Sequence, residues 1–164
     1  MSDVAAQGVQ MRPATNADAA AVRALVFGVL GEYGLKPSPT DTDADLFDIE
    51  ASYFSRGGRF DVLSNASGGI IGTVALFPID ERTVELRKMY LRGDARGRGH
   101  GRRMLEHAIK QAKRMGFARI TLETASVLKE AVALYTRYGF LPCASEHMSV
   151  RCDQTFELIL SQET

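Results

Sequence analysis

The sequence predicts an α/β fold with a mixed, mostly antiparallel sheet, and three observations lead to this prediction. Strand-like runs between residues 60 and 91 follow one another with only short turns, which is typical of an antiparallel meander. A helical pattern over 99–115 then precedes a further strand at 118–124, which is expected to lie parallel to the strand at 82–91. With the flanking segments, we expect about six to seven strands and about four helices.

The elements before the meander begin with a short strand over 9–12, which Pro13 ends. Apolar residues at helical spacing predict a first helix over 16–33. A loop with two prolines covers 34–42, and a second helix is expected over 43–56.

The meander itself is predicted to contain strands at 60–63 and 70–77 before the one that ends at residue 91. After the strand at 118–124, a fourth helix is expected over 127–138, with Gly139 as its C-terminal stop. Two short strands near 144–150 and 155–160 complete the prediction.

Length and composition are those of one globular domain over 1–164. The chain has 164 residues, of which 45% are hydrophobic and 24% charged. Residues 1–8 are expected to form a flexible tail. The two cysteines form no disulfide framework, no apolar run approaches the ~20 residues that span a bilayer, and no signal-peptide pattern is present. We therefore expect a cytoplasmic protein.

Charge is balanced overall but unevenly placed. A formal net charge of zero argues against nucleic acid or an anionic membrane as partners. The stretch 87–119 is nonetheless rich in Arg and Lys and holds only Asp94 and Glu106 as acidic residues, whereas 41–50 is acidic. A local basic patch on a neutral protein suits a small polyanion.

The run RGRGHG at 96–101 lies between the strand that ends at residue 91 and the following helix. Glycines let backbone N–H groups approach an anion, and the helix N-terminus adds about half a positive charge there. Neither the P-loop pattern nor the dinucleotide fingerprint matches, because no Lys-Ser or Lys-Thr follows Gly101 and the glycines fall as G-x-G-x-G.

This run fits R-x-x-G-x-G and resembles the acetyl-CoA pyrophosphate loop of the GCN5-related N-acetyltransferases, the GNAT superfamily. A second motif at 131–140, A-x-x-L-Y-x-x-x-G-F, resembles the C-terminal helix motif of the same family. The resemblance covers roughly residues 70–142. It implies a GNAT fold, N-acetyltransferase activity and acetyl-CoA as the cosubstrate.

The resemblance also implies cofactor contacts. The pantetheine arm would pair with the backbone of Met89, Tyr90 and Leu91, and the Met89 N–H would face the thioester oxygen. Tyr135 would be the general acid that protonates the leaving thiolate. The phosphates would be held by the turn and the helix start: Arg96, Gly97, Arg98, Gly99, His100, Gly101 and Arg102.

Glu85 is the candidate general base, directly or through a water, and Glu123 on the neighbouring strand is its rival. Strand alternation predicts that Glu85, Arg87 and Met89 share one face. Arg87 could hold a substrate carboxylate or form a salt bridge with Glu85. Tyr33 is a weak candidate for contact with the acceptor, as are Tyr53 and Phe54.

Some positions qualify these roles. Leu128 stands where many family members carry an Asn, and Ser126 or Lys129 could replace that contact. His100 is also compatible with an exposed loop residue. The histidines are too scattered for a metal site, and nothing pairs Cys143 with a base, so direct transfer without a covalent intermediate is expected.

The predicted function is acetyl transfer to the primary amine of a small metabolite, an amino acid or an amine-bearing toxin. Alternatives are a lysine or N-terminal acetyltransferase acting on proteins or peptides, a non-catalytic CoA-binding sensor and, least favoured, an RNA-binding protein. The expected partners are acetyl-CoA and a small amine, without nucleic acid, membrane or metal. We expect a monomer or a homodimer.

Overall fold

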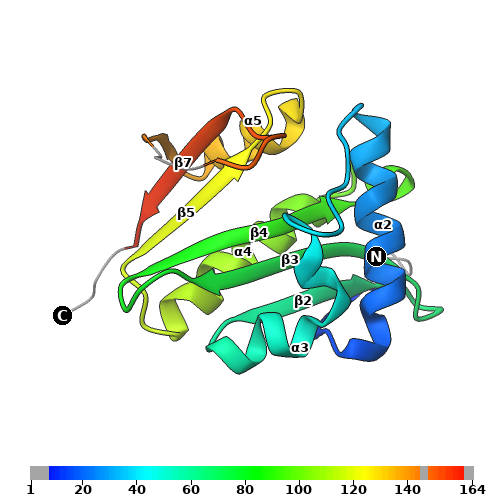
Figure 1. The fold of residues 1–164 in the computed structure, drawn as a ribbon. Helices are drawn as coiled ribbons and strands as arrows, with labels where there is room; N and C mark the ends of the chain where they lie inside the picture. Colours follow the sequence, from blue (N-terminus) through cyan, green and yellow to red (C-terminus); the bar gives the residue numbers. More distant parts are fainter. Residues whose placement is uncertain (1–7, 145–147, 161–164) are drawn as a thin grey trace, which may run out of the picture.

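The computed structural model describes residues 8–144 and 148–160, which form one mixed sheet with helices on both faces (Figure 1). The strands lie in the order β1-β2-β3-β4-β5-β7-β6, and all neighbours are antiparallel except the parallel pair β4 and β5. The predicted fold class is thereby confirmed. The strands are β1 (Gln10–Pro13), β2 (Arg59–Ser64), β3 (Ile70–Pro78), β4 (Thr83–Leu91), β5 (Arg119–Thr124), β6 (Leu141–Pro142) and β7 (Gln154–Ile159).

Two helical layers cover the sheet. One face carries α2 (Ala19–Glu32) and α3 (Ile49–Ser52), whose core cluster includes Leu30 and Phe60. The other face carries α4 (His100–Arg114) and α5 (Lys129–Arg137), whose cluster includes Met104 and Phe140. Short 3-10 turns complete the helical segments: η1 (Asn16–Asp18), η2 (Ala44–Phe47), η3 (Phe54–Arg56) and η4 (Gly93–Ala95).

β4 contains a bulge near the middle of the sheet. Between the pairs Thr73–Tyr90 and Ala75–Arg87, β3 contributes one residue and β4 contributes two. Lys88 is one of these two and has a φ of 52°, in the left-handed region that non-glycine residues rarely adopt. The buried Thr73 hydroxyl donates to the Lys88 carbonyl at 2.6 Å and so fixes the bulge from β3.

The bulge shifts the alternation of side chains along β4. Glu85 and Arg87 lie on the α2 face, where Arg87 stacks on Phe77, a residue packed against the α2 cluster. Met89 packs with the α4 cluster on the opposite face. The prediction that Glu85, Arg87 and Met89 share a face is therefore wrong, because one extra residue changes the parity of every position beyond it.

β4 and β5 separate after only four residue pairs. Thr83–Leu86 pair with Arg119–Leu122, whereas β4 continues to Leu91 and β5 to Thr124 (Figure 1). The two strands diverge beyond the last pair. The edge of β4 that faces β5 therefore has no partner strand over residues 87–91. Apart from the Leu91 carbonyl, which accepts from Arg96, its backbone groups on that side are available to a ligand.

Two predicted elements differ in the structure. The helix expected over 43–56 is broken into η2, α3 and η3, because Asp48 is extended at φ −148° and its side chain accepts the Ala51 N–H, which starts a new helix. The strand expected near 144–150 is wrong for its described residues, since 148–150 are not a strand. β6 lies earlier, directly after the buried Phe140. Of the predicted tail, residues 1–7 lie outside the described part.

Candidate active site

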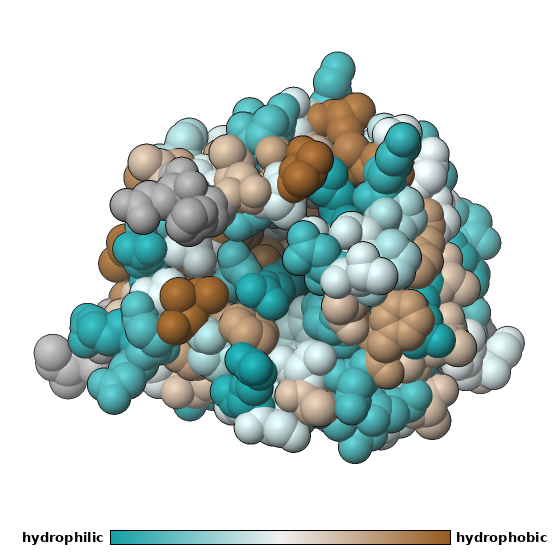
Figure 2. Space-filling view, viewed as in Figure 1, coloured by the Kyte–Doolittle hydropathy of each residue, from teal (hydrophilic) through white to brown (hydrophobic). Residues whose placement is uncertain are grey.

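A cleft of about 450 Å³ opens where β4 and β5 separate; we call it the main cleft. Its walls come from residues 85–90 of β4, 123–125 at the end of β5, the loop after α2, the helix α5 and residues 148–152. Figure 2 shows a hollow near the middle of the face seen in Figure 1, bordered largely by polar side chains. Five separate parts of the chain thus meet around one space.

A narrower space of about 120 Å³, the side channel, adjoins the main cleft between α2, β4, α4 and α5. Its lining is largely apolar and includes Val29, Leu91 and Met104. The two spaces are adjacent, because they share four lining residues: Met89, Tyr90, Leu128 and Ala131.

The glycine-rich turn lies at the side channel, which Gly101 helps to line. Gly97 and Gly99 have φ values of 78° and 84°, which residues with a Cβ rarely adopt. Gly99 is the N-cap of α4, and no side chain caps the helix there, so its first N–H groups remain available. Arg98 and Arg102 are exposed beside them. Free N–H groups, a helix dipole and two cations make this a site for an anion.

Arg96 is held by the protein rather than exposed to solvent on the turn. Its guanidinium pairs with Glu32 at 2.8 Å, donates to the Leu91 carbonyl at 2.9 Å and lies 5.4 Å from the Tyr33 ring centroid. Burial disfavours the charge, but the hydrogen bond to Glu32 and the nearby Tyr33, Glu32 and Glu130 together outweigh it and raise the Arg96 pKa. Arg96 thus joins the glycine turn to the end of α2, and Tyr33 lines the side channel beneath it.

His100 is buried, which contradicts its interpretation as an exposed loop residue. The reason is that α4 already begins at His100, so this side chain belongs to the helix and not to the open turn. Burial lowers the His100 pKa, and the nearby cations Arg103 and Arg98 lower it further. The imidazole is therefore neutral at pH 7.

Tyr135 lies on α5 and lines the main cleft, although only 5% of the residue is exposed. Its ring packs against Phe140 and Phe156, with centroids 5.7 and 6.5 Å away. Burial raises the pKa of the phenol far above its usual value, and nearby Tyr90 and Cys152 act in the same direction. The hydroxyl therefore remains protonated at neutral pH and can act as a proton donor. Tyr138 instead donates to Glu106 on α4 and joins the two helices.

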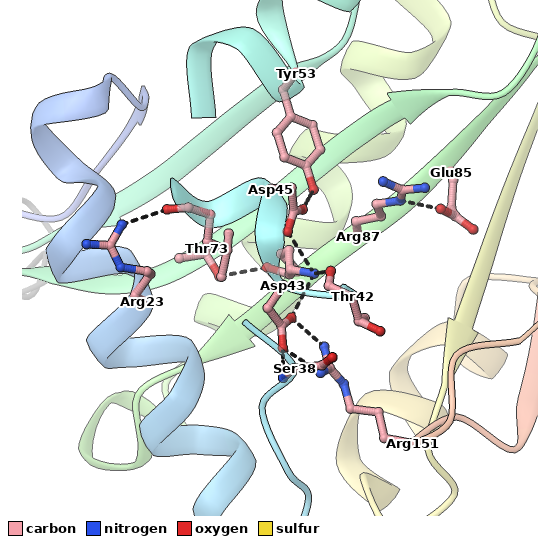
Figure 3. Close-up of polar contacts among 12 residues, drawn as sticks. Arg23, Ser38, Thr42, Asp43, Asp45, Tyr53, Thr73, Glu85, Arg87 and Arg151 are labelled. Carbon is pink, nitrogen blue, oxygen red and sulfur yellow. Dashed lines mark hydrogen bonds and ion pairs between the residues drawn. The ribbon is translucent and has the colours of Figure 1, made fainter. Parts of the chain in front are cut away.

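Glu85 and Arg87 form an ion pair in the wall of the main cleft (Figure 3). The guanidinium of Arg87 also stacks on Phe77 at 3.9 Å from the ring centroid. Of the two roles left open for Arg87, the salt bridge to Glu85 is the one present in the structure. Glu85 lies opposite Thr121 in the paired part of β4 and β5.

A buried ionic cluster behind this wall was not predicted from the sequence. Asp43 accepts two hydrogen bonds from Arg151, at 2.7 and 2.8 Å (Figure 3). The Asp43 carboxylate also lies 3.0 Å from the Lys88 ammonium. The Lys88 ammonium also donates to the Thr42 carbonyl at 2.9 Å and lies 3.4 Å from Asp45. The cluster joins the loop after α2, the bulge of β4 and the segment before β7.

Burial alone would raise the pKa of Asp43, but hydrogen bonds from Arg151 and from the Ser38 N–H outweigh it and lower the value to about 2. The pKa of Arg151 is raised by its bonds to Asp43 despite desolvation. Asp43 and Arg151 therefore both remain charged at neutral pH. Nothing in the local sequence marks this cluster, because Asp43 and Arg151 are 108 positions apart.

Other predicted residues are placed as follows. Glu123 lines the main cleft and accepts the Ser149 N–H at 2.9 Å. Ser126, which could have replaced the contact of the family Asn, instead donates to Asp153 and does not line the main cleft. Leu128, at the position of that Asn, does line it.

Tyr53, a weak candidate for acceptor contact, is fully buried and bonded to Asp45, which places it behind the wall. Phe54 packs against the α2 cluster. Within residues 8–144 and 148–160, no group of three His, Cys, Asp or Glu side chains is arranged to hold a metal. In the same residues, no helix is both long and apolar enough to traverse a bilayer.

A helix start with free N–H groups, an adjoining apolar channel and a polar cleft between separated strands together fit an extended phosphate-bearing ligand. The sequence profile of the acetyltransferase (GNAT) family matches residues 29–140. The chain therefore belongs to this family and is an N-acetyltransferase.

A relative and two solved structures agree with this assignment. The uncharacterized N-acetyltransferase YjgM of Escherichia coli (strain K12) is 34% identical over 145 residues, which cover 85% of this chain and 86% of that protein. A GNAT-family acetyltransferase from Staphylococcus aureus Mu50 has the same fold, with a TM-score of 0.87 at 21% identity over 93% of this chain and 99% of that one. YncA from Salmonella typhimurium, solved with its cofactor acetyl-CoA, has a TM-score of 0.75 at 20% identity and covers 95% of this chain and 96% of its own.

Proposed function

We propose that this protein transfers the acetyl group of acetyl-CoA to the primary amine of a small molecule by direct attack. The observation that carries the proposal is that the side channel adjoins the main cleft where β4 and β5 separate. An extended thioester in the side channel would have its pyrophosphate at the glycine turn and its acetyl group at the junction. The amine would enter through the main cleft.

The cofactor contacts in this proposal are mostly backbone contacts. The N–H groups from Gly97 to Arg102 would hold the pyrophosphate, with Arg98 and Arg102 as charged donors. The pantetheine arm would pair with the free edge of β4 at Met89, Tyr90 and Leu91. Because Arg96 already occupies the Leu91 carbonyl, its role would be to keep the turn attached to α2.

The chemistry needs three further groups. The Met89 N–H would stabilise the oxyanion that forms when the amine attacks the thioester carbonyl. Glu85, or Glu123, would take a proton from the ammonium directly or through a water, because an alkyl ammonium with a pKa of ~10.4 is not nucleophilic until it is deprotonated. As the C–N bond forms and the C–S bond breaks, Tyr135 would protonate the thiolate of CoA.

A thiol-release assay with acetyl-CoA tests the proposal over a panel of amino acids, alkyl amines, polyamines, aminoglycosides and lysine peptides, with acetylated products identified by mass spectrometry. Release of CoA that depends on a free small amine would support it. Turnover of peptides alone would favour a protein acetyltransferase. Bound acetyl-CoA by calorimetry without turnover of any amine would favour the CoA-binding sensor.

A further inference from the structure

The cations that line the main cleft are already bound by the protein's own anions. Lys88 and Arg151 both pair with Asp43, whose side chain has no exposed surface; their own side chains are 5% and 11% exposed. The Lys88 ammonium donates to the Thr42 carbonyl and lies 3.0 Å from Asp43 and 3.4 Å from Asp45, so its charge is already neutralised by the protein.

The third cation of the cleft, Arg87, is engaged in the same way. Its guanidinium pairs with Glu85 and lies over the Phe77 ring, 3.9 Å from the ring centroid. A carboxylate entering the cleft would have to displace Glu85 from an existing ion pair. The ligand would gain little binding free energy, because the displaced Glu85 carboxylate would remain nearby and repel the carboxylate of the ligand.

The carboxylates of the cleft, in contrast, are only partly used. Glu123 accepts one backbone N–H, from Ser149, and Asp41 is exposed in the wall formed by the loop after α2. Glu85 is bound through one oxygen to Arg87. Among the described residues, each cation of the cleft is therefore paired with a carboxylate, whereas the carboxylates of Asp41 and Glu123 have no cation partner.

From the pairing of every cleft cation with a carboxylate, we infer that the acceptor is an amine that carries a second positive charge and no carboxylate, such as an alkyl diamine. We further infer that Asp43 sets this preference. Asp43 determines specificity without touching the acceptor, because it keeps Lys88 and Arg151 away from the ligand. The inference rests on the proposed function and narrows its acceptor, against the amino acids that the sequence leaves open.

Three acceptors of equal chain length test the inference in the wild-type enzyme. L-lysine is 1,5-diaminopentane with an added carboxylate, and pentylamine is the same molecule without the second amine. We expect kcat/KM for 1,5-diaminopentane to exceed the values for L-lysine and for pentylamine by about tenfold or more. Equal or faster acetylation of L-lysine overturns the inference.

The variant Asp43→Asn tests the role of Asp43. It removes the charge that holds Arg151 and Lys88, so the ratio of kcat/KM for 1,5-diaminopentane over L-lysine should fall by about fivefold or more. A ratio equal to that of the wild type would overturn the role. The wild-type comparison of acceptors remains decisive if this variant fails to fold.

Asp61→Asn is the matched control. Asp61 is also buried, at 2% exposure, and is paired with Arg59 and His107, but it lies on β2, which contributes no residue to the lining of the main cleft. Its variant should lose stability and keep the acceptor ratio of the wild type. A similar fall in the ratio would show a general effect of destabilisation and contradict the assignment to Asp43.

The failure of this inference differs from the failure of the proposed function. If the three acceptors are inert while another small amine of the panel is acetylated, the charge preference is wrong and the proposed function stands. If no small amine is acetylated, the proposed function itself fails.

Discussion

The side channel and the main cleft are built in different ways. The anion site proposed at the side channel comes from one continuous stretch, 96–102, and would act through backbone N–H groups at a helix start. The main cleft is assembled from five parts of the chain, and its charges are set by ion pairs such as Asp43–Arg151. The site at the side channel thus depends on local backbone geometry, whereas the main cleft depends on side chains that only folding brings together.

Substitution of Tyr135 should have the largest effect on turnover, because this residue is the proposed proton donor to the leaving thiolate. We expect Tyr135→Phe to lower kcat about 100-fold, or ~2.7 kcal/mol, because the thiolate would leave without a proton donor. The dissociation constant for acetyl-CoA should remain within about twofold. Steady-state kinetics across pH 7–9, with calorimetry for binding, measure both.

Tyr138→Phe is the control for this prediction, since Tyr138 joins α5 to α4 and lies outside both spaces. Its kcat should match that of the wild type. Undiminished turnover by Tyr135→Phe over the whole pH range would remove Tyr135 from the mechanism.

Asp43 is expected to make the free energy of unfolding of the protein depend on pH. Its folded pKa of about 2 lies below the unfolded value of 3.8, so its contribution is present above pH 4 and is lost as pH falls through the folded value. The contribution is about 2 kcal/mol at neutral pH and about half of that at pH 3.

Urea unfolding of the wild type and of Asp43→Asn from pH 7 down to pH 3 measures this contribution. The difference in the free energy of unfolding should shrink as the pH falls. A difference that does not change with pH would show that the Asp43 carboxylate is not stabilised by its ion pairs.

At the anion site, the double substitution Arg96→Ala and Arg98→Ala should raise the dissociation constant for acetyl-CoA by about tenfold, or ~1.5 kcal/mol. Arg98 would lose a charged contact to the phosphates, and Arg96 would release the turn from Glu32. Arg114→Ala, at the far end of α4, removes an exposed arginine and should leave binding unchanged. An unchanged dissociation constant for acetyl-CoA in the double variant would contradict the assignment of the glycine turn as the phosphate site.

The two glycines that flank α4, Gly99 and Gly116, give the smallest expected effect and a close control. Gly99 and Gly116 have φ values of 84° and 90°, and neither has an atom that would meet an added Cβ. Each alanine variant should therefore lose about 1 kcal/mol of stability from left-handed strain. Only Gly99→Ala should also weaken acetyl-CoA binding, by about fivefold, because it changes the helix start. Equal binding by the two variants would contradict a backbone site at Gly99.

The sequence was sufficient for the features that depend on neighbouring residues. The glycine turn could be recognised because Gly97 and Gly99 serve a conformation set by the residues around them, and Tyr135 because it lies within a contiguous helix motif. The parallel placement of β4 and β5 follows from the helix between them. Local geometry and topology carry this information without any knowledge of packing.

Folding settled the features that depend on distant contacts. Lys88 occupies an extra position in β4, and the side-chain alternation fails there because the bulge is defined by pairing with β3. The helix expected over 43–56 is interrupted at Asp48, whose side chain starts a new helix. Asp43 and Arg151 are 108 positions apart in the sequence and form an ion pair in the fold. This pair engages the charge that Arg151 would otherwise present to a ligand. Charge pairing over such a distance leaves no periodic trace, because it is decided by the packing of segments and not by their local composition.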